Sequence, residues 1–579
     1  MREETVDVVV VAGVSTEQRV PPAPVAEPTG LTGRSALSGF GLLAVTCGVP
    51  LVVALVALRQ PRWYPGMDLA LTELLIRDVG TADTPTVGLI GRFYSLGVRG
   101  SHPGPLSFWL LWPLYRLFGS TAWALQAATV VLNLLATGLA LWIGQRRGGR
   151  TGALLVAVGV VVLARAYGAD KLAEPWNPQL PLLWWLVFLL AVWSVLCGDL
   201  KLLPLVVLVG SFCAQTHIPY VALGAGLGAL LLGFLVVTGV QRREDADYRR
   251  RLVRWGGLSL GLLVLLWLPP VVQQLTTDPG NLAVLRESFA HPTEPPAGLR
   301  PALDVWLSYL DVSWLLGDYE VNFVWARRGS QWAGIALLVV WVVAAGLAWR
   351  RRAQEPDLVR LHVVTAAALA VGLLAVSRIL GMLVYWVVMW LWGITVLVLV
   401  AIAWTVVVLW RAHRPPGRAR LPQGAVLAAL LLAGSARFTY EAAHVRAEGE
   451  GNELSEPIRA LGPEAAANLR SGDAPGGGFD GRYELRWPGH PGGFLDAAGF
   501  GILLELERHG FDVRTPVRRS DDEVPYRWTD EDDPPPTAFL DYVLGDEAIA
   551  LWRRQPGAVQ VAYDEGTYEP AALFAHPGP

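Results

Sequence analysis

The chain has 579 residues, of which 53% are hydrophobic and only 17% are charged, and its net charge is −3. Soluble domains carry about 25% charged residues, so the composition argues against a fully soluble protein. The small negative charge argues against a nucleic-acid-binding protein. Cys47, Cys197 and Cys213 lie in or beside apolar segments without metal-ligand spacing, so neither a disulfide framework nor a zinc site is expected.

The chain opens with a polar segment, residues 1–36, that contains Pro21, Pro22, Pro24 and Pro28. Segments of this composition cannot bury enough apolar surface to fold. We therefore expect a disordered tail there, on the cytoplasmic side of a membrane.

Apolar stretches long enough to cross a bilayer then follow one another through most of the chain. Windows of about 19 residues place them near 37–58, 121–143, 152–167, 180–197, 202–220, 221–240, 255–274, 332–349, 361–380, 384–410 and 421–436. This pattern predicts an α-helical polytopic membrane protein with about 11 transmembrane helices within residues 37–439. The shorter stretch 105–118 contains Pro113 and Arg116 and is expected to lie in the membrane interface.

The loops between these stretches differ in charge, and this difference predicts the orientation. The arginine-dense loops are residues 145–150, 241–254, 350–360 and 411–420. By the positive-inside rule these loops face the cytoplasm. The alternate loops, 59–104, 168–179 and 275–331, are longer or carry acidic residues and are expected outside. We therefore predict a multi-pass protein of the plasma (inner) membrane with a cytoplasmic N-terminus and an extracytoplasmic C-terminal domain.

Residues 440–579 change to a polar composition, which predicts a soluble α/β domain. Strand-like runs occur at 481–487, 511–517 and 557–563. Residues 496–509 have helical periodicity and end before Gly510, a typical helix stop.

The first expected outer loop carries the residues best suited to chemistry. Asp68 follows the first span closely, and Arg92, Arg99 and His102 come later in the same loop. A carboxylate can accept a proton, and arginines can contact an anionic group. The structural alternative is that Asp68 caps the helix predicted to start at Leu69, since Asp is a favourable N-cap residue.

The layout of this region resembles the GT-C superfamily of integral-membrane glycosyltransferases, which includes protein O-mannosyl and lipid A aminoarabinose transferases. The matching residues are Asp68, the run His102-Pro103-Gly104-Pro105-Leu106, and the run Tyr115-Arg116-Leu117-Phe118-Gly119. The resemblance is best over residues 37–240. The sequence is similar to uncharacterised bacterial membrane proteins of this type. It implies transfer of a sugar, with inversion, from a polyprenyl-phosphate donor to a hydroxyl of an outer-face glycan, lipid or protein, with Asp68 as general base.

The resemblance also implies roles for further residues. Glu174 in the second outer loop is the expected assisting carboxylate, and Arg92, Arg99 and Arg378 are expected to stabilise the leaving phosphate. Substrate contacts are further expected from Glu73, His102 and His217. Some relatives use a divalent cation, Mg²⁺ or Mn²⁺, but the outer loops contain no DxD-like motif that would support one.

Five of these residues also have a purely structural interpretation. Glu73 could be a solvated helix position, His102 could shape the start of the interfacial helix, and Glu174 could belong to a proline-rigid turn. Arg92 and Arg99 could be headgroup partners. Many GT-C members carry an acidic pair at the catalytic position, whereas Leu69 follows Asp68 here, and Glu73 lies about 140° away on a helix.

Two other functions stay open at the level of sequence. The first is a transporter or flippase for a lipid-linked saccharide, and the second is a non-catalytic partner in envelope-polymer assembly. Ion-coupled transporters place ionisable residues near the bilayer midplane, whereas the candidates here cluster in outer loops or at outer span ends. This distribution favours the enzyme.

Overall fold

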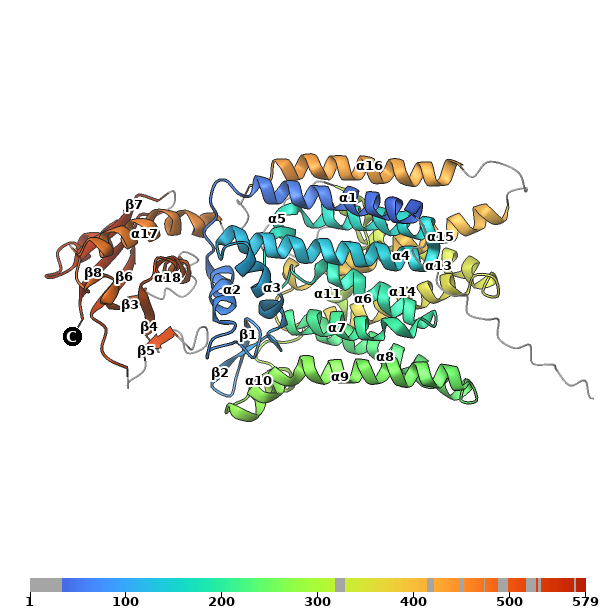
Figure 1. Cartoon of the computed structure of the whole chain (residues 1–579), viewed down its shortest axis with the longest axis horizontal. Coiled ribbons are helices and arrows are strands. Elements are labelled where there is room, and N and C mark those ends of the chain that lie inside the picture. The colour runs from blue at the N-terminus through green and yellow to red at the C-terminus, as the bar shows by residue number, and fades with distance from the viewer. Residues whose placement is uncertain are drawn as a thin grey trace, which may run out of the picture.

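The structure is a computed structural model that describes residues 34–317, 329–413, 421–446, 452–472, 474–487, 498–516, 527–529, 533–566 and 569–578. Most of the predicted tail 1–36 lies outside the described residues. The chain forms a long helical bundle with a smaller α/β domain at one end (Figure 1).

Within the described residues, eight helices are long and apolar enough to cross a membrane. They are α1 (Arg34–Ala57), α4 (Ala122–Tyr167), α8 (Pro219–Gln241), α9 (Ala246–Thr276), α13 (Gln331–Arg350), α14 (Pro356–Ser377), α15 (Leu391–Ala412) and α16 (Leu421–Ala443). Two shorter apolar helices, α6 (Leu182–Leu196) and α7 (Leu203–Thr216), complete the bundle. The predicted polytopic helical membrane protein is thus confirmed, and every predicted span falls on one of these helices. The number of crossings stays a prediction.

Helix α4 contains two of the predicted spans because it reverses direction. A straight helix of its 46 residues would be about 69 Å long. Gly149, however, has φ 58° and ψ −148°, outside the helical region. A Cβ built on Gly144 would lie 2.8 Å from Val156 Cγ2, although these residues would be about 18 Å apart along a straight helix. The segment is therefore a helical hairpin that turns at Gly149.

The interior and the periphery of the bundle differ in burial, although both are apolar. On α6 and α15 most side chains are buried, including the large residues Trp185, Trp193 and Trp392. On α9, Leu260, Leu265 and Leu275 are exposed, as expected for a helix that faces lipid. A helix that is apolar on all sides is stable in either environment.

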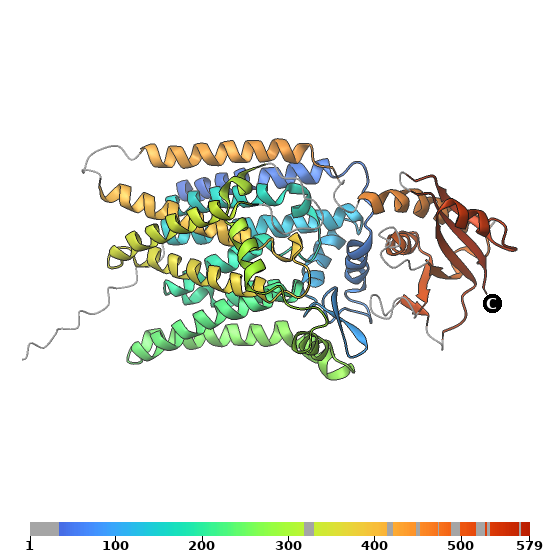
Figure 2. The same cartoon turned by 180° about the vertical axis from the view of Figure 1, so that it is seen from behind.

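The loops predicted to lie outside fold into short elements. The first contains α2 (Met67–Asp78) and a hairpin of β1 (Ile90–Ser95) and β2 (Val98–Ser101), followed by α3 (Leu106–Leu117). The others contain α5 (Ala169–Ala173), α10 (Asn281–Ala290), α11 (Leu299–Tyr309) and α12 (Val312–Leu316). Figures 1 and 2 place α2, β1, β2 and α10 at the end of the bundle that faces the C-terminal domain.

The C-terminal domain is a six-stranded mixed sheet with helices packed against it. Its elements are α17 (Asn452–Ser471), β3 (Arg482–Arg486), α18 (Ala498–Arg508), β4 (Asp512–Pro516), β5 (Trp528–Thr529), β6 (Ala538–Leu544), α20 (Asp546–Trp552), β7 (Val559–Asp564) and β8 (Ala571–Pro577). The strand order is β5-β4-β3-β6-β8-β7, with parallel pairs as far as β6 and antiparallel pairs beyond it. The predicted soluble α/β region is confirmed, while the boundary at 440 falls inside α16, which continues to Ala443.

Candidate active site

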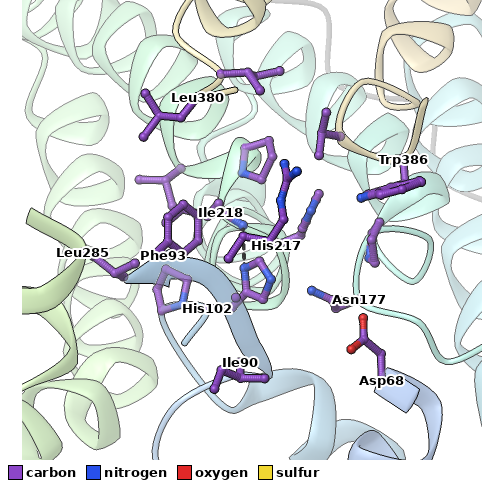
Figure 3. A pocket seen from close by; sticks show the side chains of 18 of the residues that line it. Asp68, Ile90, Phe93, His102, Asn177, His217, Ile218, Leu285, Leu380 and Trp386 are labelled. Carbon is purple, nitrogen blue, oxygen red and sulfur yellow. Dashed lines mark hydrogen bonds between the residues drawn. The ribbon is translucent and has the colours of Figure 1, made fainter. Parts of the chain in front are cut away.

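A cavity of about 1160 Å³ opens between the bundle and its loops. Its wall comes from α2, the β1–β2 hairpin, the segment after α5, and the ends of α7, α8, α10 and α14. The acidic residues of the lining are Asp68, Asp170, Glu174 and Glu294, and the basic residues are Arg92, Arg99, Lys171, Arg286 and Arg378. Figure 3 shows Asp68 and Asn177 on one side, and His102 and Phe93 on the other.

Asp68 lies half-buried in the first turn of α2 and lines the cavity. Gly66 is the N-cap of this helix, and the Asp68 carboxylate instead accepts the indole N–H of Trp176 at 2.9 Å. The alternative that Asp68 caps the helix is therefore wrong. Burial raises the pKa of the Asp68 carboxyl, and the hydrogen bond from Trp176 opposes this increase.

The backbone immediately before Asp68 is strained. Met67 has φ 44°, in the left-handed region that residues with a side chain rarely adopt. Such a conformation persists only where the surroundings hold it, and it is often found at functional sites.

The second outer loop supplies the part of the wall next to Asp68. Glu174 follows α5 and lines the cavity together with Trp176, Asn177 and Gln179. In the orientation of the Gln179 amide that gives both its oxygen and its nitrogen suitable partners, the nitrogen donates a hydrogen bond to Glu174 Oε2 at 3.0 Å. The ring centroids of Trp176 and Trp386 are 5.7 Å apart. The lining therefore contains two carboxylates, Asp68 and Glu174, and an aromatic pair of which Trp176 is bonded to Asp68.

The two predicted histidines meet in the cavity wall. Their ring centroids lie 5.2 Å apart, and His102 Nδ1 accepts the backbone N–H of Ile218 at 3.1 Å. Burial lowers the pKa of His102 to about 3, so its ring is neutral at physiological pH. Because Nδ1 is an acceptor, the proton lies on Nε2. His102 can therefore donate a hydrogen bond, but it does not supply a charge.

Close packing explains why the predicted His-Pro-Gly-Pro run has a glycine at position 104. A Cβ on Gly104 would lie 2.1 Å from Oε1 of Gln215, near the end of α7. This run therefore packs the start of α3 closely against α7. This packing is compatible with the structural interpretation that His102 shapes the start of α3. It is equally compatible with the place of His102 in the cavity lining.

The cavity contains the three predicted arginines and two cations that the sequence interpretation missed. Arg92 and Arg99 come from the β-hairpin, and Arg378 is the C-cap of α14. Lys171 on α5 and Arg286 on α10 also line it. Arg286 lies within the longest outer loop, but no local feature of the sequence indicates that it lines the same cavity as Asp68.

Glu73 is the predicted substrate contact that the structure places elsewhere. Within the described residues it lies outside the cavity lining, on the face of α2 toward the C-terminal domain. Its carboxylate accepts the hydroxyl of Tyr115 at 2.8 Å and two hydrogen bonds from Arg508. Its alternative interpretation as a solvated position is also wrong, because the side chain is fully buried.

The described residues contain no group of three or more His, Cys, Asp or Glu side chains that could hold a metal ion. The possible Mg²⁺ or Mn²⁺ ion stays an untested expectation.

No family model and no curated protein matches this sequence. Among solved structures, ArnT from Cupriavidus metallidurans bound to undecaprenyl phosphate is 14% identical with a TM-score of 0.51, and the alignment covers 92% of this chain and 98% of that one. Apo ArnT has a TM-score of 0.47 at 14% identity, covering 93% and 98%. The apo oligosaccharyltransferase from Archaeoglobus fulgidus has a TM-score of 0.36 at 12% identity, covering 82% and 64%. The first similarity shows that this chain has the fold of ArnT, which confirms at the level of fold the predicted resemblance to GT-C membrane glycosyltransferases.

Proposed function

We propose that this protein is a membrane glycosyltransferase that moves a sugar from a polyprenyl-phosphate donor to a hydroxyl group of an outer-face acceptor. The observation that carries the proposal is the position of Asp68 in the wall of a cavity shared with Glu174 and five basic side chains. The ArnT structure with the same fold holds undecaprenyl phosphate, which supports a donor of this chemical class.

The lining suits a substrate that is both charged and lipid-like. Apolar side chains in the lining include Val221 and Ala222 near the start of α8, and Ile379 follows the basic Arg378 directly at the end of α14. A polyprenyl phosphate needs both kinds of contact, because its tail is apolar and its headgroup is anionic. This combination favours a lipid-linked donor over a free nucleotide sugar.

The proposed reaction is a single displacement. Asp68 takes the proton of the acceptor hydroxyl as that oxygen bonds to the anomeric carbon. The bond from the anomeric carbon to the phosphate oxygen breaks at the same time, its electron pair leaves with the phosphate, and the carbon is inverted. Arg92, Arg99 and Arg378 stabilise the negative charge on the departing phosphate. Glu174 assists as a second carboxylate, and neutral His102 donates a hydrogen bond.

The placement of the charges argues against a transporter. Ion-coupled transporters bind their ions near the bilayer midplane, whereas the charged lining residues here come from loops and helix ends, such as the first turn of α2 and the C-cap of α14. The alternative of a non-catalytic assembly partner predicts no sugar transfer by the wild-type protein in the experiment that follows.

The test is transfer of labelled sugar from polyprenyl phosphate by membranes that contain Asp68→Asn. We expect transfer to fall by about 10²- to 10⁴-fold, the usual contribution of a general base. Asp83→Asn is the matched control, because Asp83 is exposed in the same loop and outside the described cavity lining. Unchanged transfer by Asp68→Asn would rule out Asp68 as the base, and donor movement across vesicles without transfer would support the flippase.

A further inference from the structure

The C-terminal domain contacts the segment that leads into α2 and then α2 itself at two further positions. Before the helix begins, Arg62 pairs with Glu505 at 2.9 Å, and the Tyr64 N–H donates to Ser455 Oγ at 3.0 Å. In its middle, Arg508 bonds to Glu73 at 2.5 and 3.1 Å.

At the other end of α2, Arg527 donates two hydrogen bonds to Asp78, at 2.8 and 2.9 Å. Arg527 also bonds to Glu507 of α18. We call this set of contacts the α2 clamp: Arg62, Glu73 and Asp78 on one side, and Glu505, Glu507, Arg508 and Arg527 on the other.

Most charges of the α2 clamp are removed from water. The side chains of Glu73 and Glu505 are 0% exposed, and those of Arg508 and Arg527 are 9% and 10% exposed. The nearby carboxylates raise the pKa of both arginines despite their burial. Removing one member leaves a buried charge without its partner, so these contacts do not exchange freely for water.

Helix α18, which carries Glu505, Glu507 and Arg508 of the α2 clamp, also contacts the backbone shortly before Asp68. A Cβ on Gly501 of α18 would lie 2.7 Å from the carbonyl oxygen of Pro65, so α18 lies against the chain at that residue. Gly66, Met67 with its φ of 44°, and Asp68 follow directly. A strained backbone of this kind needs neighbours that hold it.

Helix α2 is thus held between two structures. Asp68 at its start lines the cavity, while Glu73, about 140° away around the helix, faces the C-terminal domain. Because a helix moves as a rigid rod over so short a length, a movement at Glu73 or Asp78 is transmitted to Asp68.

We propose that the C-terminal domain is a positioning element for the candidate base, and that Arg508 and Arg527 are positioning residues that act through α2 on Asp68. This inference rests on the proposed function for its kinetic consequence. A base must be placed accurately, since a 1 Å displacement costs about 100-fold in rate.

The kinetic test compares Arg508→Gln with the wild-type protein in the sugar-transfer assay. We expect kcat to fall by about 10- to 100-fold, with a much smaller change in KM for the donor. Arg508→Lys, which keeps the charge, should recover most of the loss. Arg470→Gln is the matched control, because Arg470 is an exposed arginine of the same domain whose guanidinium lies over Phe479. Arg527→Gln, made without any change at Arg508, should also lower kcat.

A second measurement does not depend on catalysis. In an Asp68→Cys background, the rate of labelling by a polar maleimide reports the position of the start of α2, and the three native cysteines are buried. We expect Arg508→Gln to change this rate, and Arg470→Gln to leave it unchanged. If Asp68→Asn is inactive while folded Arg508→Gln keeps normal kcat and labelling, the positioning role is overturned and the proposed function stands. If Asp68→Asn is active, the proposed base fails, and the labelling rate alone decides the positioning role.

Discussion

Asp68 and Glu73 have the same charge and lie on the same short helix, but their surroundings give them different roles. Asp68 faces a cavity and receives one hydrogen bond from an indole. Glu73 is fully buried and bonds to Tyr115 and Arg508. A carboxylate that is saturated by an arginine is a structural anchor, whereas one in a cavity wall with a raised pKa is free to exchange a proton.

The hydrogen bond from Trp176 gives a prediction about pH. The indole N–H stabilises the ionised form of Asp68, so Trp176→Phe should raise the pKa of Asp68 further. A general base works in its ionised form, so the acidic limb of the plot of kcat/KM against pH should move to higher pH. The pH profile of sugar transfer measures this shift directly.

The control for that prediction is Trp109→Phe, which removes the indole N–H that donates to the Pro85 carbonyl at 3.1 Å and leaves Asp68 untouched. Its acidic limb should coincide with that of the wild-type protein. If both variants behave alike, the hydrogen bond to Asp68 has no role in setting the pH dependence.

At the scale of elements, the reversal of α4 determines how the first part of the bundle is built. The hairpin brings Gly144 and Gly152 so close that a Cβ on Gly152 would lie 2.3 Å from the Gly144 carbonyl oxygen. This obstacle is backbone rather than a flexible side chain, so it cannot move aside alone. The glycines therefore set the distance between the two arms of the hairpin.

Gly152→Ala should consequently destabilise the bundle. Forcing a methyl group into a packed site costs about 1–3 kcal/mol, which should appear as a lower thermal unfolding temperature in detergent. Gly138→Ala, in the same helix, is the matched control because a Cβ there meets nothing within 4 Å. It should be neutral or slightly stabilising, since Ala is the better helix former. Equal melting temperatures for the two variants would contradict the close approach.

The elements also show what sequence can and cannot predict. Membrane spans can be predicted because their signal is local: a run of apolar residues marks each helix wherever it packs. The predicted strands 481–487 and 511–517 likewise overlap β3 and β4. Strand β6 was missed although its run from Phe539 to Val543 is rich in aromatic and β-branched residues.

Contacts in the candidate site were harder to predict than elements. Asp68, Glu174, His102, His217 and the three arginines were predicted and all line the cavity. Lys171 and Arg286 were missed, and Arg286 is brought to the cavity by packing that the sequence does not show. Glu73 was predicted as a substrate contact, whereas its carboxylate lies outside the lining and bonds to Arg508. The Arg508 partner of Glu73 is 435 positions away. The catalytic roles of the predicted residues stay predictions.

At the scale of the whole molecule, the bundle has two chemically different ends. The C-terminal domain, α2 and α10 gather at one end (Figures 1 and 2), and residues of α2 and α10 line the cavity. The arginine-dense loop between α8 and α9 lies at the other end. The positive-inside rule predicts that this arginine-dense end is cytoplasmic.

Labelling of introduced cysteines tests this orientation. Glu547→Cys lies at an exposed position near the start of helix α20 in the C-terminal domain. Glu244→Cys lies in the loop between α8 and α9, where the Glu244 side chain is 92% exposed. In right-side-out membrane vesicles, a membrane-impermeant maleimide should label the first variant, and should label the second only after permeabilisation. The opposite pattern would reverse the predicted topology.

The α2 clamp also sets the order in which the protein matures during its synthesis. Glu73 and Asp78 leave the ribosome 435 and 449 positions before Arg508 and Arg527. At typical translation speeds of about 5–20 residues per second, the first interval lasts roughly 20 to 90 s. During this time both carboxylates lack their arginine partners, because Arg508 and Arg527 have not yet been synthesised. A nascent chain therefore carries the candidate base from the start, but lacks the means to hold it in place until its last segment has folded.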